Sequence, residues 1–192
     1  MKRDIILAGV GGQGILSIAA VIGLAAVESG LYLKQAEVHG MSQRGGAVQS
    51  HLRLSNSPIA SDLIPEGKCD LILSVEPMEA LRYLSFLSGD GWVITSSKTF
   101  ENIENYPSDT ELFKAIEKVE NHLIIDASDI ARNLGSQKVS NMVMLGAASN
   151  YLGLAHESLN DAVRALFGRK GEEMVQLNIS ALSAGRNAPG ST

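Results

Sequence analysis

Three glycines near the start of the chain have the spacing of a phosphate-binding turn. Gly9, Gly11 and Gly14 follow a short apolar run and fit the pattern G-x-G-x-x-G, with Gly12 and Gln13 inside it. Glycines at this spacing allow a sharp turn and a close approach of backbone to ligand, and the N–H groups of the following helix attract an anion. The same spacing also suits a strand-to-helix turn that binds nothing, so both alternatives stay open.

An acidic residue stands where a dinucleotide-binding fold places its ribose contact. Glu37 lies 23 residues after Gly14, at the end of a segment, 31–37, that alternates like a β-strand. The candidate cofactor-binding residues are therefore Gly9, Gly11, Gly12, Gln13, Gly14 and Glu37.

The segment directly after Glu37 has a composition that few plain connectors share. Residues 38–46 include a histidine, an arginine and three glycines. Successive glycine N–H groups beside an arginine favour a phosphate, a carboxylate or an acidic side chain of a partner, whereas a solvent loop needs the glycines only for its turn. The candidate residues of this substrate or interface loop are His39, Met41, Ser42, Gln43, Arg44, Gly45 and Gly46. None of them is assigned a catalytic role.

A sheet must hold these segments, and the chain has the pattern for one. Apolar strand-like runs alternate with helix-like segments, which predicts a doubly wound α/β fold with a mostly parallel sheet and helices on both faces, a three-layer, Rossmann-like arrangement. The expected strands cover 4–8, 31–37, 47–54, 69–75, 92–95 and 123–126, and the expected helices 12–28, 76–87, 110–119, 126–135, 142–152, 156–167 and 171–184. The segment 31–37 is expected to be the second parallel strand of a β-α-β unit. One domain should span 1–184, with a flexible tail at 185–192.

Two elements carry further expectations. The helix at 12–28 has almost no polar face, so we expect the sheet and a second layer or a partner chain to bury it all round. The strand at 47–54 alternates apolar residues with Gln49, His51 and Arg53, which predicts one wet or partner-facing side and makes His51 a surface histidine.

The composition excludes several classes of function. A formal net charge of -5 and a pI near 5.4 argue against a general nucleic-acid-binding surface, which must be basic. Cys69 is the single cysteine, so an internal disulfide, a cysteine-ligated zinc site and an iron–sulfur cluster are excluded, and any cluster must lie on another polypeptide. The triplet 89–91, Gly-Asp-Gly, with Asn121 downstream could be taken for a thiamine-diphosphate signature, but it precedes a strand and is more simply a turn.

The uncharged run 5–27 raises the question of a membrane segment. The glycine turn divides this run into a strand and a helix, and no small-residue cleavage signal is evident before Glu28. We therefore expect a cytoplasmic protein that does not span a membrane.

The two glycine-bearing motifs together resemble a known family. The segments 9–15 and 37–46 look like those of the gamma component of the 2-oxoacid:ferredoxin oxidoreductases, and within that family the similarity is greatest to the indolepyruvate type, whose subunit is called beta. The resemblance continues through Ser50-His51, Ile64–Gly67, Glu76–Ala80 and Asn141–Gly146, to about residue 168. The second motif is much more specific than the first.

The resemblance implies an accessory subunit that is inactive alone and binds no cofactor by itself. Its large (alpha) partner would carry thiamine diphosphate, magnesium and 4Fe-4S clusters. The assembly would oxidatively decarboxylate an aryl pyruvate with coenzyme A as co-substrate, giving an aryl-acetyl-CoA and reduced ferredoxin. His39, Ser42, Gln43 and Arg44 carry over as motif positions that line the interface or the approach to substrate and coenzyme A.

Three alternatives remain open. The chain could be a stand-alone dinucleotide-binding oxidoreductase that uses the turn 9–14 and Glu37, although no pair of residues for hydride transfer is visible. It could also be the equivalent gamma subunit of a pyruvate or 2-oxoglutarate oxidoreductase. Lastly, it could be a scaffold without any ligand, whose loop at 37–46 only binds a partner.

Overall fold

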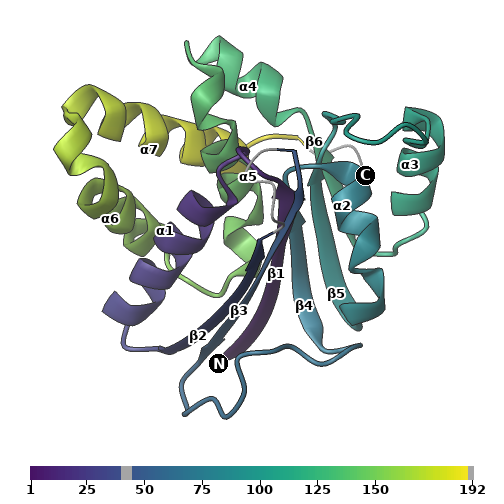
Figure 1. Cartoon of the computed structure of the whole chain (residues 1–192). Helices are drawn as coiled ribbons and strands as arrows, with labels where there is room; N and C mark the ends of the chain where they lie inside the picture. Colours follow the sequence, from purple (N-terminus) through teal and green to yellow (C-terminus); the bar gives the residue numbers. More distant parts are fainter. Residues whose placement is uncertain (40–44, 190–192) are drawn as a thin grey trace.

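A six-stranded sheet lies between two layers of helices in the computed structural model, which describes residues 1–39 and 45–189 (Figure 1). The strands are β1 (Lys2–Val10), β2 (Tyr32–His39), β3 (Ala47–Ser55), β4 (Cys69–Ser74), β5 (Leu87–Ser96) and β6 (His122–Ile125). The helices are α1 (Ile15–Glu28), α2 (Pro77–Arg82), α3 (Asp109–Ile116), α4 (Ala127–Asn133), α5 (Ser140–Ala148), α6 (His156–Phe167) and α7 (Glu172–Arg186). The predicted α/β fold class is confirmed.

The strand order is β2-β3-β1-β4-β5-β6. β1, β4, β5 and β6 pair in parallel, whereas β3 is antiparallel to both of its neighbours, β1 and β2. The expected β-α-β unit is therefore split, because β3 lies between the first strand and the second. Ser50, His51 and Leu52 follow one another in β3 and are all buried, so the middle of this strand is covered on both faces.

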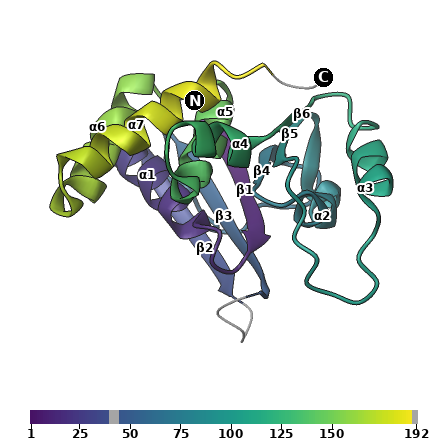
Figure 2. The same ribbon diagram turned by 90° about the horizontal axis from the view of Figure 1, so that it is seen from above.

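The apolar helix α1 is covered mainly by its own chain. One side packs on β1, β2 and β3, and another meets α5 and α6 (Figure 2). Of the two coverings that the sequence left open, a second layer or a partner chain, α6 supplies the second layer. Leu16 and Val27 remain about half exposed, at 49% and 55%. No helix of the described chain has both the length and the apolar character needed to cross a membrane.

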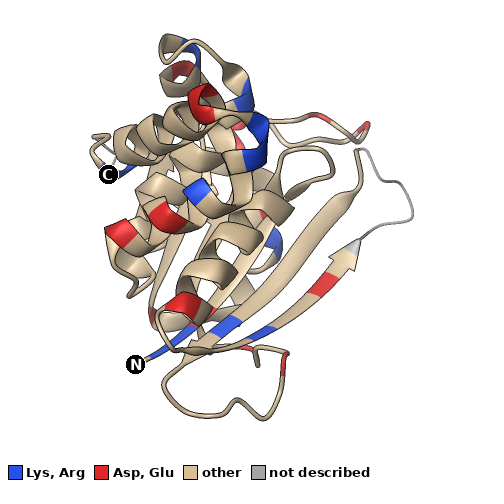
Figure 3. Ribbon diagram, turned by 90° about the vertical axis from the view of Figure 1, so that its left-hand side faces the viewer, with Lys and Arg blue, Asp and Glu red and all other residues tan. Residues whose placement is uncertain are grey.

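Charged residues are scattered rather than gathered on the face that carries α1 and α6. Figure 3 shows Lys and Arg interspersed there with Asp and Glu, and long uncharged stretches between them. A nucleic-acid-binding face would instead present a continuous basic stripe. The distribution agrees with the acidic composition.

The last helix is longer than the sequence indicates. α7 continues to Arg186, so Gly185 and Arg186 are helical and do not belong to the expected tail. The reason is a close crossing with α5: a Cβ on Gly185 would fall on the carbonyl oxygen of Val143, and a Cβ on Gly146 on that of Leu182. Glycine at both positions lets the two helix backbones touch.

His51 is buried at 5% exposure, which contradicts its expected surface position. The segment that follows β3 folds back over this face, and the N–H of Ile64 donates to His51 Nδ1 at 3.0 Å. The ring also meets Phe86 edge to face, with centroids 5.5 Å apart. Burial, and then the charge of Arg53, lower the pKa of His51, against the opposing influence of Asp4 and Asp62.

We expect this histidine to make the chain less stable at acid pH. Because its pKa is lower in the folded chain than the ordinary value of about 6.5, the unfolded chain binds more protons below that pH, and the free energy of unfolding should fall by up to about 1.4 kcal/mol per pH unit. Urea titrations at intervals between pH 7 and 5 measure this slope. His51→Asn keeps an acceptor for Ile64 N–H but cannot titrate, so its slope should be shallower; equal slopes would contradict the assignment.

Candidate functional site

Three segments that are distant in sequence meet at the carboxyl ends of the parallel strands, the upper edge in Figure 1. The N–H of Gly11 donates to Gly46 O at 2.8 Å, and the N–H of Gly45 to Gly11 O at 3.5 Å. Asn102 Nδ2 donates to Gly45 O at 3.0 Å. The structure thus joins the first glycine motif to the end of the second, at the edge where open α/β sheets bind their ligands.

Two glycines of the first motif are required by packing. A Cβ on Gly9 would collide with the side chain of Val75 at the end of β4, and a Cβ on Gly14 would lie 2.5 Å from Asn141 Nδ2 in α5. Asn141 Nδ2 in turn donates to Gly14 O at 3.2 Å. Gly14 therefore serves the contact between α1 and α5, as a plain strand-to-helix turn would also require.

The middle of the motif faces the edge of the sheet. Gly12 is exposed at the tip of the turn. Gln13 folds back, so that its Oε1 accepts the N–H of Val10 at 2.8 Å. With Gly11, these residues stay candidates for contact with a ligand.

Glu37 does not join this group. In the sheet register Glu37 of β2 lies opposite Ser50 of β3. Ser50 in turn lies opposite Leu7 of β1, three residues before that strand ends. Two strand spacings, about 10 Å, separate Glu37 from β1. Its carboxylate is hydrogen-bonded by Gln35 instead. A ribose contact from Glu37 is not supported, because the inserted β3 occupies the neighbouring position that a dinucleotide fold gives to the acidic strand.

Part of the second motif lies outside the described residues. This is true of Met41, Ser42, Gln43 and Arg44, and of the side chain of His39, whose backbone ends β2. Gly45 and Gly46 are described and reach the glycine turn. The assignment of this loop to substrate or interface therefore stays a prediction.

A small polar cavity opens at the same edge and measures about 90 Å³. Its polar lining comes from three places in the fold: the turn after β1, the end of β5, and the first turns of α4 and α5. The residues are, in that order, Gln13; Ser96 and Lys98; Ser128 and Ser140. Sites that enclose a whole drug-sized ligand measure about 300–1,000 Å³, so this cavity suits one small group. Hydroxyls and an ammonium group favour an anion.

Residues 97–108, here called the strap, cross this edge and are tied to a buried carboxylate. Glu76 is fully buried after β4, and its Oε1 accepts hydrogen bonds from the hydroxyl of Tyr106 and from the N–H of Phe100. Its Oε2 accepts the N–H of Glu79 at 2.9 Å and so caps α2. Burial, followed by the bond to Glu76, raises the pKa of Tyr106, so its hydroxyl remains a donor at neutral pH.

The family profile described as pyruvate ferredoxin/flavodoxin oxidoreductase matches residues 4–188. The chain belongs to this family. This oxidoreductase chain is 36% identical to the indolepyruvate oxidoreductase subunit IorB of Archaeoglobus fulgidus, over 97% of its own length and 95% of that protein. To IorB of Pyrococcus horikoshii it is 35% identical, over 97% and 96%. These matches confirm the resemblance drawn from the motifs.

Some members of the oxidoreductase family are much longer. Ketoisovalerate oxidoreductase subunit VorA of Methanothermobacter thermautotrophicus is 26% identical over 93% of this chain, which spans 35% of that protein. A 2-oxoglutarate:ferredoxin oxidoreductase chain from Magnetococcus marinus has the same fold, with a TM-score of 0.76 at 21% identity, and this chain covers 30% of it. Subunit PORC of pyruvate oxidoreductase from Thermotoga maritima, with a TM-score of 0.74 at 21% identity, is matched over 94% of its length.

The sequence analysis missed most of the cavity. Ser96, Lys98, Ser128 and Ser140 carry no motif, and each is an ordinary surface residue type. The signal that they share is their position, because each lies at or directly after the carboxyl end of a strand or begins a helix. Segments at such positions converge in any parallel sheet, so a search restricted to strand ends would have found Ser96 and Lys98.

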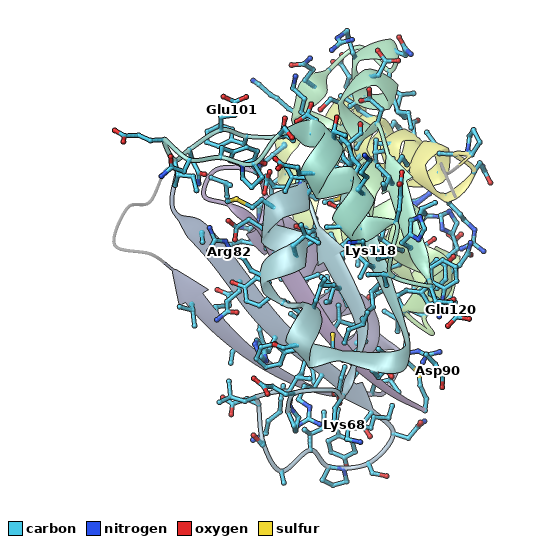
Figure 4. All side chains as sticks on the ribbon, turned by 90° about the vertical axis from the view of Figure 1, so that its right-hand side faces the viewer. Lys68, Arg82, Asp90, Glu101, Lys118 and Glu120 are labelled. Atoms are coloured by element: carbon cyan, nitrogen blue, oxygen red, sulfur yellow. The ribbon has the colours of Figure 1, made fainter. Side chains whose placement is uncertain are left out.

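The described residues of this oxidoreductase chain do not fit an iron–sulfur cluster or a metal site. Cys69 is buried, and burial raises the pKa of its thiol to about 12, so the thiolate that would ligate iron is disfavoured. Residues 89–91 lie inside β5, so the expectation that this triplet is a turn before the strand is wrong. Asp90 lies at the opposite end of the molecule from Glu101 of the strap (Figure 4). Within the described ranges, no three His, Cys, Asp or Glu side chains are placed to hold a metal ion.

Proposed function

We propose that this chain is the accessory, beta-type subunit of an indolepyruvate:ferredoxin oxidoreductase. The observation that carries the proposal is the match to IorB over nearly the whole of both chains at 36% identity. The pyruvate/ketoisovalerate common subunit gamma of Pyrococcus furiosus is 28% identical over 86% of this chain, which favours the indolepyruvate type over the equivalent subunit of a pyruvate enzyme.

In this proposal the larger subunit supplies the redox chemistry. Thiamine diphosphate, magnesium and 4Fe-4S clusters would lie on that partner. In support, the described part of this chain has one cysteine, which is buried, and no three His, Cys, Asp or Glu side chains placed to hold a metal ion. The assembly would convert an aryl pyruvate and coenzyme A into an aryl-acetyl-CoA and reduce ferredoxin. It would act in the cytoplasm, without nucleic acid or membrane.

The role proposed for this chain's own residues is to hold an anionic group of coenzyme A. The cavity is small, polar and carries Lys98, which suits one phosphate group, and the adjoining turn presents Gly11, Gly12 and Gln13. The structure of the Magnetococcus marinus protein was obtained with coenzyme A bound to it, which supports the choice of coenzyme A as the ligand here. Ser96 Oγ accepts the N–H of Lys98 at 3.0 Å, which fixes the backbone that carries the lysine.

Association with the partner tests the subunit assignment. The chain should be expressed with and without the large thiamine-bearing subunit and analysed by size-exclusion chromatography with light scattering. We expect co-elution in a fixed ratio and no turnover by the isolated chain. A chain that never associates, or that oxidises indolepyruvate unaided, would sink the proposal.

Lys98→Gln tests the cavity. The loss of a charged hydrogen bond to a phosphate costs about 1.5–3 kcal/mol, so the KM for coenzyme A in the assembled enzyme should rise roughly tenfold to 150-fold. Because Lys98 is proposed to contact coenzyme A and not the keto acid, the KM for the keto acid should stay the same. Lys118→Gln, an exposed substitution beyond α3, is the control and should change neither constant. An unchanged KM for coenzyme A in Lys98→Gln would contradict the assignment.

A further inference from the structure

The strap presents two apolar side chains to solvent close to the candidate site. Phe100 is 45% exposed and Ile103 is 47% exposed. Asn102, which lies between them in the sequence, donates to Gly45 O, so this part of the strap is joined to the second glycine motif. Exposed apolar side chains that lie close together often mark an interface.

The backbone that carries these side chains is fixed from within. The N–H of Phe100 and the hydroxyl of Tyr106 both bond to Glu76, which is fully buried. A loop held by a buried carboxylate has already lost much of the freedom that binding would otherwise remove. Such preorganisation favours tight association.

Acidic residues accompany the apolar pair. Glu101 follows Phe100 directly, Glu104 follows Ile103 directly, and both are exposed. Figure 4 shows the Glu101 side chain projecting away from the body of the molecule. A surface complementary to the strap would therefore be apolar at its centre and basic at its rim.

We propose that the strap is a docking site for the larger subunit of the same oxidoreductase, with Phe100 and Ile103 entering an apolar depression bordered by lysine or arginine. This inference rests on the proposed function. In VorA and in the Magnetococcus marinus chain, the matched region is 35% and 30% of a longer polypeptide, so this domain has a larger neighbour within the same chain there. The strap also carries Lys98, so the partner would meet this chain directly beside the cavity.

The chain offers a matched control on another surface. Leu16 and Val27 of α1 are exposed to a similar extent, at 49% and 55%. They lie on a helix whose other sides are covered by the sheet and by α6. If the partner sat on α1 instead, truncation of this second pair would weaken assembly.

The experiment titrates the purified large subunit with fluorescently labelled full chain. Removal of two central anchors should weaken binding about thirtyfold or more in Phe100→Ala/Ile103→Ala, while Leu16→Ala/Val27→Ala binds like the unsubstituted chain. At low salt, Glu101→Lys/Glu104→Lys should associate with the large subunit more slowly than the unsubstituted chain. At high salt the difference between the two association rates should be smaller, because salt screens the charges. Circular dichroism and thermal unfolding of each isolated variant establish that it is folded.

Two results would overturn the inference. If the unsubstituted chain assembles but Phe100→Ala/Ile103→Ala binds equally well, the strap is not the docking site and the proposed function stands. If the unsubstituted chain does not bind the large subunit at all, the proposed function fails and the docking site fails with it.

Discussion

Gly185→Ala is expected to abolish stable folding or to lower the free energy of unfolding by about 3 kcal/mol or more. The new methyl carbon would lie 1.9 Å from the Val143 carbonyl oxygen, and a backbone atom cannot move aside as a flexible side chain can. Overpacking of a core typically costs about 1–3 kcal/mol, and a clash between two helix backbones belongs at or above the upper end of that range. α5 would have to separate from α7, although both contribute to the main core.

The measurement is urea denaturation followed by circular dichroism, with Gly168→Ala as the matched control. A Cβ on Gly168 would meet nothing within 4 Å, so this second change should be neutral or should stabilise by up to about 1 kcal/mol. Equal stability of Gly185→Ala and Gly168→Ala would mean that α5 and α7 do not cross as closely as described.

Arg53→Ala is the second large effect, with an expected loss of about 3–5 kcal/mol in the free energy of unfolding. Arg53 donates to both oxygens of Asp4, at 2.7 and 3.1 Å, and Asp4 is completely buried. The same guanidinium donates to the carbonyl oxygens of Ser61 and Leu63 at 3.0 Å, and so holds the segment that covers β3. Truncation would leave a buried charge whose remaining ion pair, among the described residues, is with the exposed Lys2.

Arg132→Ala is the control for this change. Arg132 pairs with Asp129 at 2.7 Å, but both side chains are more than half exposed, so its loss should cost less than about 1 kcal/mol. Chemical denaturation of both variants compares the buried ion pair with the exposed one. A loss from Arg53→Ala no greater than that from Arg132→Ala would contradict the structural role of Arg53. Arg53 also borders a second cavity, of about 270 Å³, which lies at the amino end of β1 and is separate from the candidate site.

Periodicity in the sequence located the elements because burial acts on each one separately. The helix expected at 156–167 is α6 without any change of bounds. The helix predicted at 126–135 begins as expected, with the Asp126 side chain accepting the N–H of Asp129 at 2.8 Å. Such signals are local, so one sequence suffices to find them.

The order of the strands depends on contacts between distant segments, and the predicted neighbour of β1 in the first β-α-β unit was wrong. The alternation of 31–37 and 47–54 fits a neighbour on either side, and nothing in it says that β3 separates β2 from β1. The position of Glu37 was misjudged for that reason. His51 was misjudged because the segment that buries it lies outside the strand itself.

Long-range packing limited the remaining predictions. Gly185 stands in a polar, glycine-bearing end and resembles tail sequence, yet its helical state depends on α5, whose Gly146 lies 39 residues earlier. The cavity residues could not be predicted for a related reason, because the end of β5 and the starts of α4 and α5 must be brought together before Ser96, Lys98, Ser128 and Ser140 share a site. The glycine turn was found at once, but its two packing partners, Val75 and Asn141, were not.

The central claim is that this chain completes an oxidoreductase whose redox chemistry lies elsewhere. The most direct measurement is a titration of the purified large subunit with this chain, in which the reduction of ferredoxin by indolepyruvate, with coenzyme A present as acyl acceptor, is followed by absorbance. Activity should be absent with either subunit alone and should rise to a plateau at a fixed ratio of the two. Full activity of the large subunit by itself, or turnover by this chain by itself, would contradict the account.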